Sequence, residues 1–241
     1  MKQTELIMGM PITVEIEDTS VTQEIMDQVF DYFRSIDEQF SVYKTTSEIT
    51  KINDGLIPAS EASKEMRLIF DLCEETKQAT SGYFDIRDRN GRLDPSGIVK
   101  GWAIYEASKL LKKLGMNIFF VDVGGDIQVS GKRWDIGIKH PFDQTEIVKV
   151  MHLEDRGVAT SGTYIRGQHI YDPFAKDQHI DEIVSLTVIG PNVHEADRFA
   201  TAAFAMKRKG IEFIEGLPGF EGYMIDRDGI ATMTSGFEQY T

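Results

Sequence analysis

The stretch LDPSGIVKGWA at 93–103, followed at 121–131 by VDVGGDIQVSG, constrains the fold more than any other part of the sequence. In the first stretch a polar, glycine-containing turn runs directly into an amphipathic helix, which we expect over 98–114 with a stop at Gly115. In the second, two glycines and an aspartate separate two short apolar runs, which is the pattern of a β-hairpin. Helices mixed with sequential hairpins favour an α+β fold over a sheet in which strands and helices alternate.

The remaining elements follow from the spacing of apolar residues. Ser20-x-x-Gln23 has the pattern of a capping box, and it opens a helix whose apolar residues recur up to Phe40 at spacings of three and four. We expect a second helix over 60–79, and a loop at VATSG (158–162) whose backbone N–H groups face a ligand. The other expected elements are strands at 6–17, 118–123, 127–129, 134–138, 148–153, 183–189, 222–226 and 230–234, and helices at 194–208 and 211–215.

The overall charge of the chain excludes some partners. The 241 residues carry a formal net charge of −13, so the surface repels phosphate backbones and anionic lipids, and we expect neither nucleic-acid nor membrane-surface binding. An anionic ligand would therefore need a local source of positive charge at its site, such as a metal, a lysine or a helix N-terminus. The single cysteine, Cys73, excludes an intrachain disulfide and a cysteine-rich metal cluster. No apolar run is long enough to span a bilayer, and the first residues have no export signal, so we expect a cytoplasmic protein without a membrane anchor.

Two oxygen-bearing residues suggest a metal. Asp197 and Thr201 are four residues apart on an expected helix, so both side chains lie on one face. A carboxylate and a hydroxyl suit Mg²⁺, which takes few protein ligands and completes its octahedron with water and phosphate. Such pairs are common on helices, and an aspartate in the first turn also stabilises the helix dipole. Spacing alone therefore favours a structural role for the pair over a metal site.

Three other residues each have a structural alternative beside a functional one. His169 is the best general-base candidate because histidine titrates near neutrality, although a lone histidine is more often structural. Lys100 near the start of its helix opposes the helix dipole, which suggests an anion nearby, but a solvated lysine is as common. Tyr43 could stack on a flat ring or close a helix–loop corner. The sequence has no G-x-G-x-x-G after a strand, no G-K-[ST] loop, no G-x-S-x-G elbow and no H-x-x-x-H pair.

Several blocks, in this order, resemble the ApbE family, the FAD:protein FMN transferases. These blocks are MGMPITV (8–14), FSVYKTTSEITKIN (40–53), GYFD (82–85), LDPSGIVKGWA (93–103), VDVGGDIQVSG (121–131), VATSGTY (158–164), HIYDP (169–173) and EADRFATAAF (195–204). The resemblance implies an ApbE-like α+β fold, mostly antiparallel sheet with packed helices, in a single domain over 1–241 or in two closely packed lobes.

The resemblance also implies an FAD and Mg²⁺ site. Its metal ligands would be Asp197, Thr201 and the carbonyl of Gly97, and His169 would be the catalytic base. The implied FAD contacts are Met8, Tyr43, Tyr83, Phe84, Asp85, Asp94, Lys100 and Ile170. The implied reaction transfers FMN from FAD to a threonine or serine hydroxyl of an acceptor flavoprotein and releases AMP.

The sequence departs from the family pattern at several points. Trp102 stands where the family has tyrosine, Tyr105 where it has aspartate, and Gln168 where it has a first histidine. Only the eight residues 86–93 occupy the place of a long family insertion. Two alternative functions therefore stay open: an FAD pyrophosphatase that yields FMN and AMP, and a flavin-binding protein without turnover.

Overall fold

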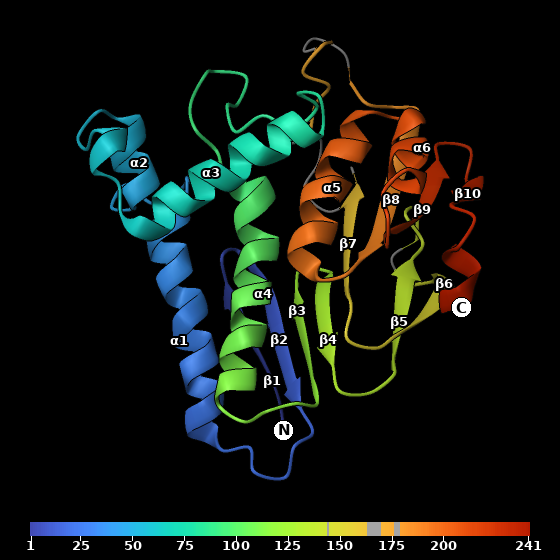
Figure 1. Cartoon of the computed structure of the whole chain (residues 1–241), viewed down its shortest axis with the longest axis horizontal. Coiled ribbons are helices and arrows are strands. Elements are labelled where there is room, and N and C mark those ends of the chain that lie inside the picture. The colour runs from blue at the N-terminus through green and yellow to red at the C-terminus, as the bar shows by residue number, and fades with distance from the viewer. Residues whose placement is uncertain (144, 163–169, 176–178) are drawn as a thin grey trace.

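The structure, a computed structural model, describes residues 1–143, 145–162, 170–175 and 179–241 and contains one large sheet flanked by helices (Figure 1). The sheet has eight strands in the order β1-β2-β3-β4-β7-β8-β9-β10, and every neighbouring pair is antiparallel. Strands β5 and β6 form a separate antiparallel ribbon. The strands are β1 Lys2–Ile7, β2 Met10–Ile16, β3 Phe119–Val123, β4 Asp126–Ser130, β5 Trp134–Lys139, β6 Ile147–Leu153, β7 Gly157–Gly162, β8 Ile183–Gly190, β9 Glu221–Asp226 and β10 Ala231–Met233.

The helices gather along one face of the large sheet. They are α1 Gln23–Phe40, α2 Glu48–Asn53, α3 Lys64–Ala79, α4 Ser96–Lys113, α5 Val193–Ala205 and α6 Lys209–Glu215, with short 3₁₀ turns η1 Ala59–Glu61 and η2 Phe237–Tyr240. Figure 1 shows α1 and α4 alongside the β1–β3 end of the sheet, and α5 over β7 and β8. The two groups of helices meet where α4 packs against α5.

Three apolar clusters hold these layers together. The first joins α1, α3 and α4 to β2 and β3, and the second joins α5 and α6 to β7, β8 and β9. The third lies between the other face of the sheet and the β5–β6 ribbon, and Phe237 of η2 is buried within it. The C-terminal half of the sheet is therefore covered on both faces, by helices on one and by the ribbon on the other.

The fold confirms the expected class, a mixture of helices and antiparallel sheet, but three of the predicted elements are wrong. The strand expected at 6–17 is the hairpin of β1 and β2, because Met8 and Gly9 between them adopt φ of 57° and 71° and turn the chain back. The helix expected at 60–79 begins later, at Lys64 after its cap Ser63, because the preceding residues form η1.

The third wrong element is the loop expected at 158–162, which forms most of the central strand β7 between β4 and β8. The capping box predicted at Ser20 is also wrong. The N-cap of α1 is Thr22, whose hydroxyl accepts a hydrogen bond from the Ile25 N–H at 3.4 Å. In the described part of the chain, no helix is long and apolar enough to cross a membrane.

His194, near the start of α5, is a buried histidine without a carboxylate in close contact. Its side chain is 7% exposed, its Nε2 lies 3.9 Å from the nearest carboxylate oxygen of Glu195, and no described residue hydrogen-bonds to its Nδ1. Burial, and to a lesser extent the positive charges of Arg198 and Lys109, lower the pKa of His194 to about 4.

This lowered pKa predicts a loss of stability on mild acidification. Below about pH 6.5 the unfolded chain gains a proton at His194 that the folded protein does not take up until about pH 4, so the free energy of unfolding falls across this range. Urea unfolding at pH 7.5, 6 and 5 should show a decline that His194→Asn reduces, by about 2 kcal/mol at pH 5. His152→Asn, at a histidine that pairs with Asp135 at 2.6 Å on the β5–β6 ribbon, is the control. Equal declines in the wild type and in His194→Asn would contradict the prediction.

Candidate functional site

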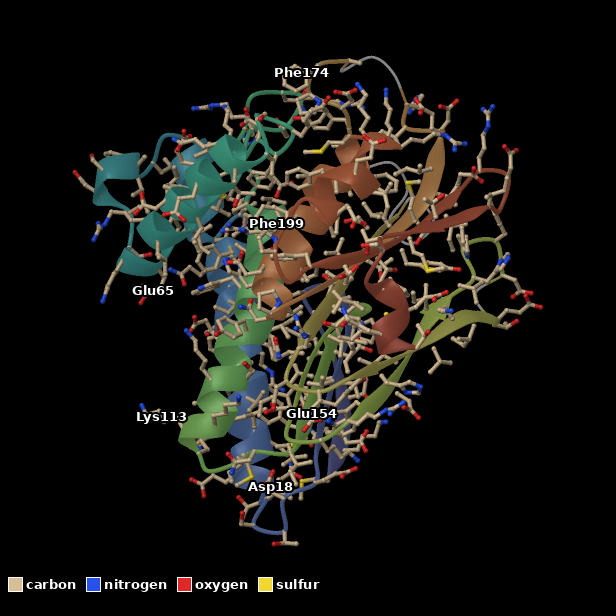
Figure 2. All side chains as sticks on the ribbon, turned by 45° about the vertical axis from the view of Figure 1, so that its right-hand side comes forward. Asp18, Glu65, Lys113, Glu154, Phe174 and Phe199 are labelled. Atoms are coloured by element: carbon tan, nitrogen blue, oxygen red, sulfur yellow. The ribbon has the colours of Figure 1, made fainter. Side chains whose placement is uncertain are left out.

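A cleft of about 250 Å³ opens where the start of α4, the end of β7 and the helix α5 converge. The segment 83–88 after α3 and the segment 170–173 complete its walls. Its lining residues are Tyr43, Tyr83, Phe84, Asp85, Ile86, Arg87, Asp88, Asp94, Ser96, Gly97, Lys100, Gly124, Thr160, Ser161, Gly162, Ile170, Tyr171, Pro173, Asp197 and Thr201. Figure 2 shows Phe174 at the top of the molecule, above the helix that carries Phe199.

Aromatic side chains form the outer part of the cleft. Tyr83 packs edge-on against Phe174, with ring centroids 4.9 Å apart. The guanidinium of Arg89 lies 5.0 Å from the ring centroid of Tyr171, and the Tyr171 hydroxyl donates a 2.7 Å hydrogen bond to the Arg87 carbonyl. Tyr43, which also lines the cleft, is 94% exposed. A flat apolar ligand would find aromatic surfaces on which to stack here.

The short segment between the GYFD and LDPSG blocks is tied firmly in place. Arg87 and Leu93 pair as a β-bridge, and the side-chain amide of Asn53 both donates to the Leu93 carbonyl and accepts from its N–H, each at 2.8 Å. Asp94 then caps the first turn of α4 by accepting from the Ser96 N–H at 3.0 Å. The eight residues that replace the long insertion therefore form a small hairpin at the edge of the cleft.

At the floor of the cleft Lys100 and Asp197 line the cavity, and Asp126, which contacts Lys100, completes a cluster of three charged groups from three elements. Asp126 of β4 and Asp197 of α5 are 1% and 3% exposed, and the ammonium of Lys100 of α4 is close to both of them. The Lys100 ammonium contacts Asp126 Oδ2 and lies 3.6 Å from Asp197 Oδ1. Two buried acids share one ammonium here, so a further cation would stabilise their ionised forms.

The electrostatics of Asp197 reflect this crowding. Burial is the main reason that the pKa of Asp197 is raised, and the neighbouring Asp126 carboxylate raises it further. Lys100 and the hydrogen bond from the Gly101 N–H act in the opposite direction. A cation bound beside Asp197 would favour the ionised carboxylate.

Glycines let α4 and α5 approach closely enough to form this floor. A Cβ on Gly101 would lie 2.6 Å from Asp197 Cβ and 2.9 Å from the Val193 carbonyl oxygen, and the Gly101 N–H donates to Asp197 Oδ2 at 2.8 Å. In a regular helix that N–H would bond to the carbonyl of Gly97, four residues earlier. The Asp197 carboxylate therefore competes with the Gly97 carbonyl for this donor.

The structure brings ten of the twelve predicted site residues to this one cleft. They are Tyr43, Tyr83, Phe84, Asp85, Gly97, Asp94, Lys100, Ile170, Asp197 and Thr201. Met8 instead lines a smaller adjoining pocket of about 70 Å³, which shares Tyr43, Ser96 and Lys100 with the cleft. His169 lies outside the described residues. The role of each residue stays a prediction.

Asp126 was not predicted from the sequence, whereas VATSG (158–162) was expected to face a ligand, and its residues Thr160, Ser161 and Gly162 line the cleft from the end of β7 rather than from a loop. Asp126 is the last residue of the Gly-Gly-Asp corner, which the sequence indicated only as a hairpin turn. The Thr160 N–H donates to Asp126 Oδ1 at 3.0 Å, so β7 fixes the carboxylate from the neighbouring strand. An aspartate after two glycines is also what an ordinary exposed turn has, so the sequence contains no signal for the burial of Asp126.

The oxygen atoms at the floor suit a hard cation. No group of three or more His, Cys, Asp or Glu residues in the described ranges could hold a metal without other ligands. Asp197 and Thr201 nevertheless line the same cleft as Gly97, which adds a backbone carbonyl. A carboxylate, a hydroxyl and a carbonyl fit Mg²⁺, which keeps several sites for water and phosphate oxygens.

The fold and site define an α+β domain with an aromatic-walled cleft over buried carboxylates. The chain belongs to the ApbE family, whose model matches residues 8–89 and 86–224. It is 28% identical over 162 residues to the FAD:protein FMN transferase of Vibrio cholerae, a match that covers 61% of this chain and 47% of that protein. The Escherichia coli K12 protein of the same name is 27% identical over 151 residues, covering 57% and 43%.

The matched part therefore spans about half the length of these curated relatives. Solved structures show the same fold at lower identity. The flavin transferase ApbE from Vibrio cholerae superposes with a TM-score of 0.86 at 19% identity, covering 100% of this chain and 99% of that one. The ApbE protein from Thermotoga maritima superposes with a TM-score of 0.87 at 20% identity, covering 100% and 98%.

The close approach at Gly101 predicts a specific stability cost. Gly101→Ala should lower the free energy of unfolding by about 1–3 kcal/mol, because the added methyl overlaps Asp197 and the Val193 carbonyl. Gly216→Ala is the matched control, since the nearest atom to a Cβ there is 3.5 Å away and its φ is −76°. Urea unfolding monitored by circular dichroism measures both variants. Equal stability of the two would show that α4 and α5 tolerate a wider spacing.

Proposed function

We propose that this protein is an FAD:protein FMN transferase that uses Mg²⁺. It would transfer FMN from FAD to a threonine or serine hydroxyl of an acceptor flavoprotein and release AMP. The observation that carries the proposal is the joining, in one cleft, of an aromatic wall to a floor of buried carboxylates and a lysine. Membership of the ApbE family and the names of the curated relatives support it.

The two ends of the cleft suit the two parts of FAD. Tyr43 and Tyr83 offer flat surfaces for the isoalloxazine ring. We propose that Met8, Phe84, Asp85, Asp94 and Ile170 also contact FAD, Met8 from the adjoining pocket. Lys100 supplies the positive charge that an anionic pyrophosphate needs to approach a protein of net charge −13.

Asp197, Thr201 and the Gly97 carbonyl are the residues that would hold Mg²⁺. The hydrogen bond from the Gly101 N–H to Asp197 Oδ2 supports this assignment. In a regular helix the Gly97 carbonyl would accept from that N–H, so the Asp197 carboxylate competes with the carbonyl for the donor. When bound, Mg²⁺ would neutralise charge that develops on the pyrophosphate. Thr201 Cγ2 would lie 3.5 Å from a Cβ on Gly97, so the two residues are neighbours across the α4–α5 contact.

The reaction forms one bond and breaks one. The acceptor hydroxyl oxygen attacks the FMN-side phosphorus, and the bond from that phosphorus to the bridging oxygen breaks, so AMP leaves with the electron pair. We propose that His169 takes the proton of the attacking hydroxyl. The same site with water as the nucleophile would be the FAD pyrophosphatase, and a site without turnover would be a flavin-binding protein.

Chromatography for FMN and AMP, after incubation with FAD and Mg²⁺, tests the proposal directly. Incubation should include an arm with an acceptor flavoprotein and an arm without it. Covalent flavin on the acceptor with equimolar AMP is expected. Free FMN and AMP in both arms would instead identify a pyrophosphatase, and intact FAD in both arms a flavin-binding protein.

The metal ligands predict graded losses in this assay. Asp197→Asn keeps an oxygen for the Gly101 N–H but removes the anionic ligand, so the Mg²⁺-dependent rate should fall by at least about 10³-fold, or about 4 kcal/mol. Thr201→Val should cost less, because water can replace a neutral ligand. Glu212→Ala, which removes an exposed carboxylate from α6, is the control for net charge. A wild-type rate in Asp197→Asn would exclude Asp197 as a metal ligand.

The proposed role of His169 as the base predicts a different effect on the kinetics. His169→Asn should lower the transfer rate by about 10²–10⁴-fold at saturating FAD while FAD affinity changes little, because a positioned base acts on the chemical step. The wild-type rate should also fall as pH drops through the histidine pKa, near 6.5 when unperturbed. Stopped-flow rates and FAD titrations at pH 5–8 measure both effects. A flat pH profile with chemistry rate-limiting would remove His169 from the mechanism.

A further inference from the structure

The three charged groups on the cleft floor are held asymmetrically. Each carboxylate has one oxygen on a backbone N–H: Asp126 Oδ1 accepts from Thr160 at 3.0 Å, and Asp197 Oδ2 accepts from Gly101 at 2.8 Å. The other oxygen of each faces Lys100. These backbone bonds fix both carboxylates, so the ammonium is the mobile member of the cluster.

The ammonium of Lys100 is placed with one acid rather than between the two. It contacts Asp126 Oδ2, whereas its distance of 3.6 Å to Asp197 Oδ1 is beyond that of a hydrogen bond. Asp126 is 1% exposed and lies on β4, close enough to Asp197 of α5 that its carboxylate raises the pKa of Asp197. A buried ammonium takes the nearest fixed carboxylate, because an uncompensated charge is costly there.

We propose that Asp126 is a positioning residue that holds the Lys100 ammonium away from Asp197 and so keeps Asp197 available to Mg²⁺. The inference rests on the metal site of the proposed function. Asp126 acts here through Lys100 rather than as a metal ligand.

The consequence of removing Asp126 follows from charge and distance. In Asp126→Asn the amide no longer compensates the ammonium. Asp122 and Asp197 are the other acids in its field, and Asp197, at 3.6 Å, is the one that forms an ion pair with it. Lys100 then pairs with Asp197 and occupies the place of a metal. The single variant therefore weakens Mg²⁺ binding although every ligand is intact.

A double-mutant cycle on Mg²⁺ affinity separates this role from two others. MgCl₂ is titrated by calorimetry into the wild type, Asp126→Asn, Lys100→Met and the double variant, each as the full chain. Removing Lys100 should tighten Mg²⁺ binding at least about 10 times more in the Asp126→Asn background than in the wild type, because only there does the ammonium block Asp197. Lys132→Met, which removes a lysine paired with Glu17 at 2.7 Å on the surface, is the control for net charge.

The other outcomes overturn the proposal. An equal effect of Lys100→Met in both backgrounds means that the two charges act only at a distance and additively. A smaller effect in the Asp126→Asn background means that Asp126 is itself a metal ligand, which Lys100 masks. Absence of Mg²⁺ binding in the wild type also overturns it.

A second measurement covers the case in which Lys100→Met does not fold. A crystal structure of metal-free Asp126→Asn should place Lys100 Nζ within about 3 Å of Asp197 Oδ1, the distance of a charge-assisted hydrogen bond. An ammonium that keeps its distance from Asp197 overturns the proposal. Failure of the proposed function is recognised separately, because wild-type protein would then form no covalent flavin on the acceptor, whatever its Mg²⁺ affinity.

Discussion

The approach of α4 to α5 at Gly101 is the contact on which the rest of the cleft depends. Because Gly101 has no side chain, Asp197 reaches the backbone of α4 and accepts a hydrogen bond from within the helix. This bond orients the carboxylate toward Lys100 and sets Thr201 one helical turn further along the same face. The same contact joins the two groups of helices, and thus the two apolar clusters on that face of the sheet.

The cleft combines rigid and exposed parts. Its floor is fixed by backbone hydrogen bonds to buried acids, whereas its outer wall contains an aromatic ring that is 94% exposed. Preorganised charges suit the stabilisation of a reacting phosphate, since they need little rearrangement when charge develops. An exposed ring such as that of Tyr43 becomes buried when a flat ligand stacks on it, which contributes to binding.

Much of this arrangement could be predicted from the sequence, because the relevant signals are local. The helix that begins beside Gly97 and the hairpin at the Gly-Gly-Asp corner follow from spacing and turn residues, and the spacing of Asp197 and Thr201 on one helix face is preserved. The resemblance to the ApbE family grouped residues that the structure brings to one cleft. The order of the motifs along the chain was enough for this grouping.

What could not be predicted depends on contacts between distant elements. VATSG has the composition of a turn, but it is a central strand because β4 and β8 pair with it on both sides. The turn at Met8 was hidden because it requires a positive φ at a residue that rarely adopts one. Asp126 was hidden because its importance comes from Lys100 and Thr160, which neither spacing nor composition connects to it.

The residues that form the cleft floor are far apart in the sequence, which has a consequence for how the protein folds. Gly101 and Asp197 are separated by 96 positions, and Asp126 and Thr160 by 34, so the floor consists of long-range contacts. Closing such loops costs entropy that local helix formation does not recover, and these contacts therefore form late in folding. In a partly folded chain, Asp126 and Asp197 are solvated and apart, and they do not share the Lys100 ammonium. The site is thus a property of the finished domain, and no fragment that ends before α5 can contain a weaker form of it.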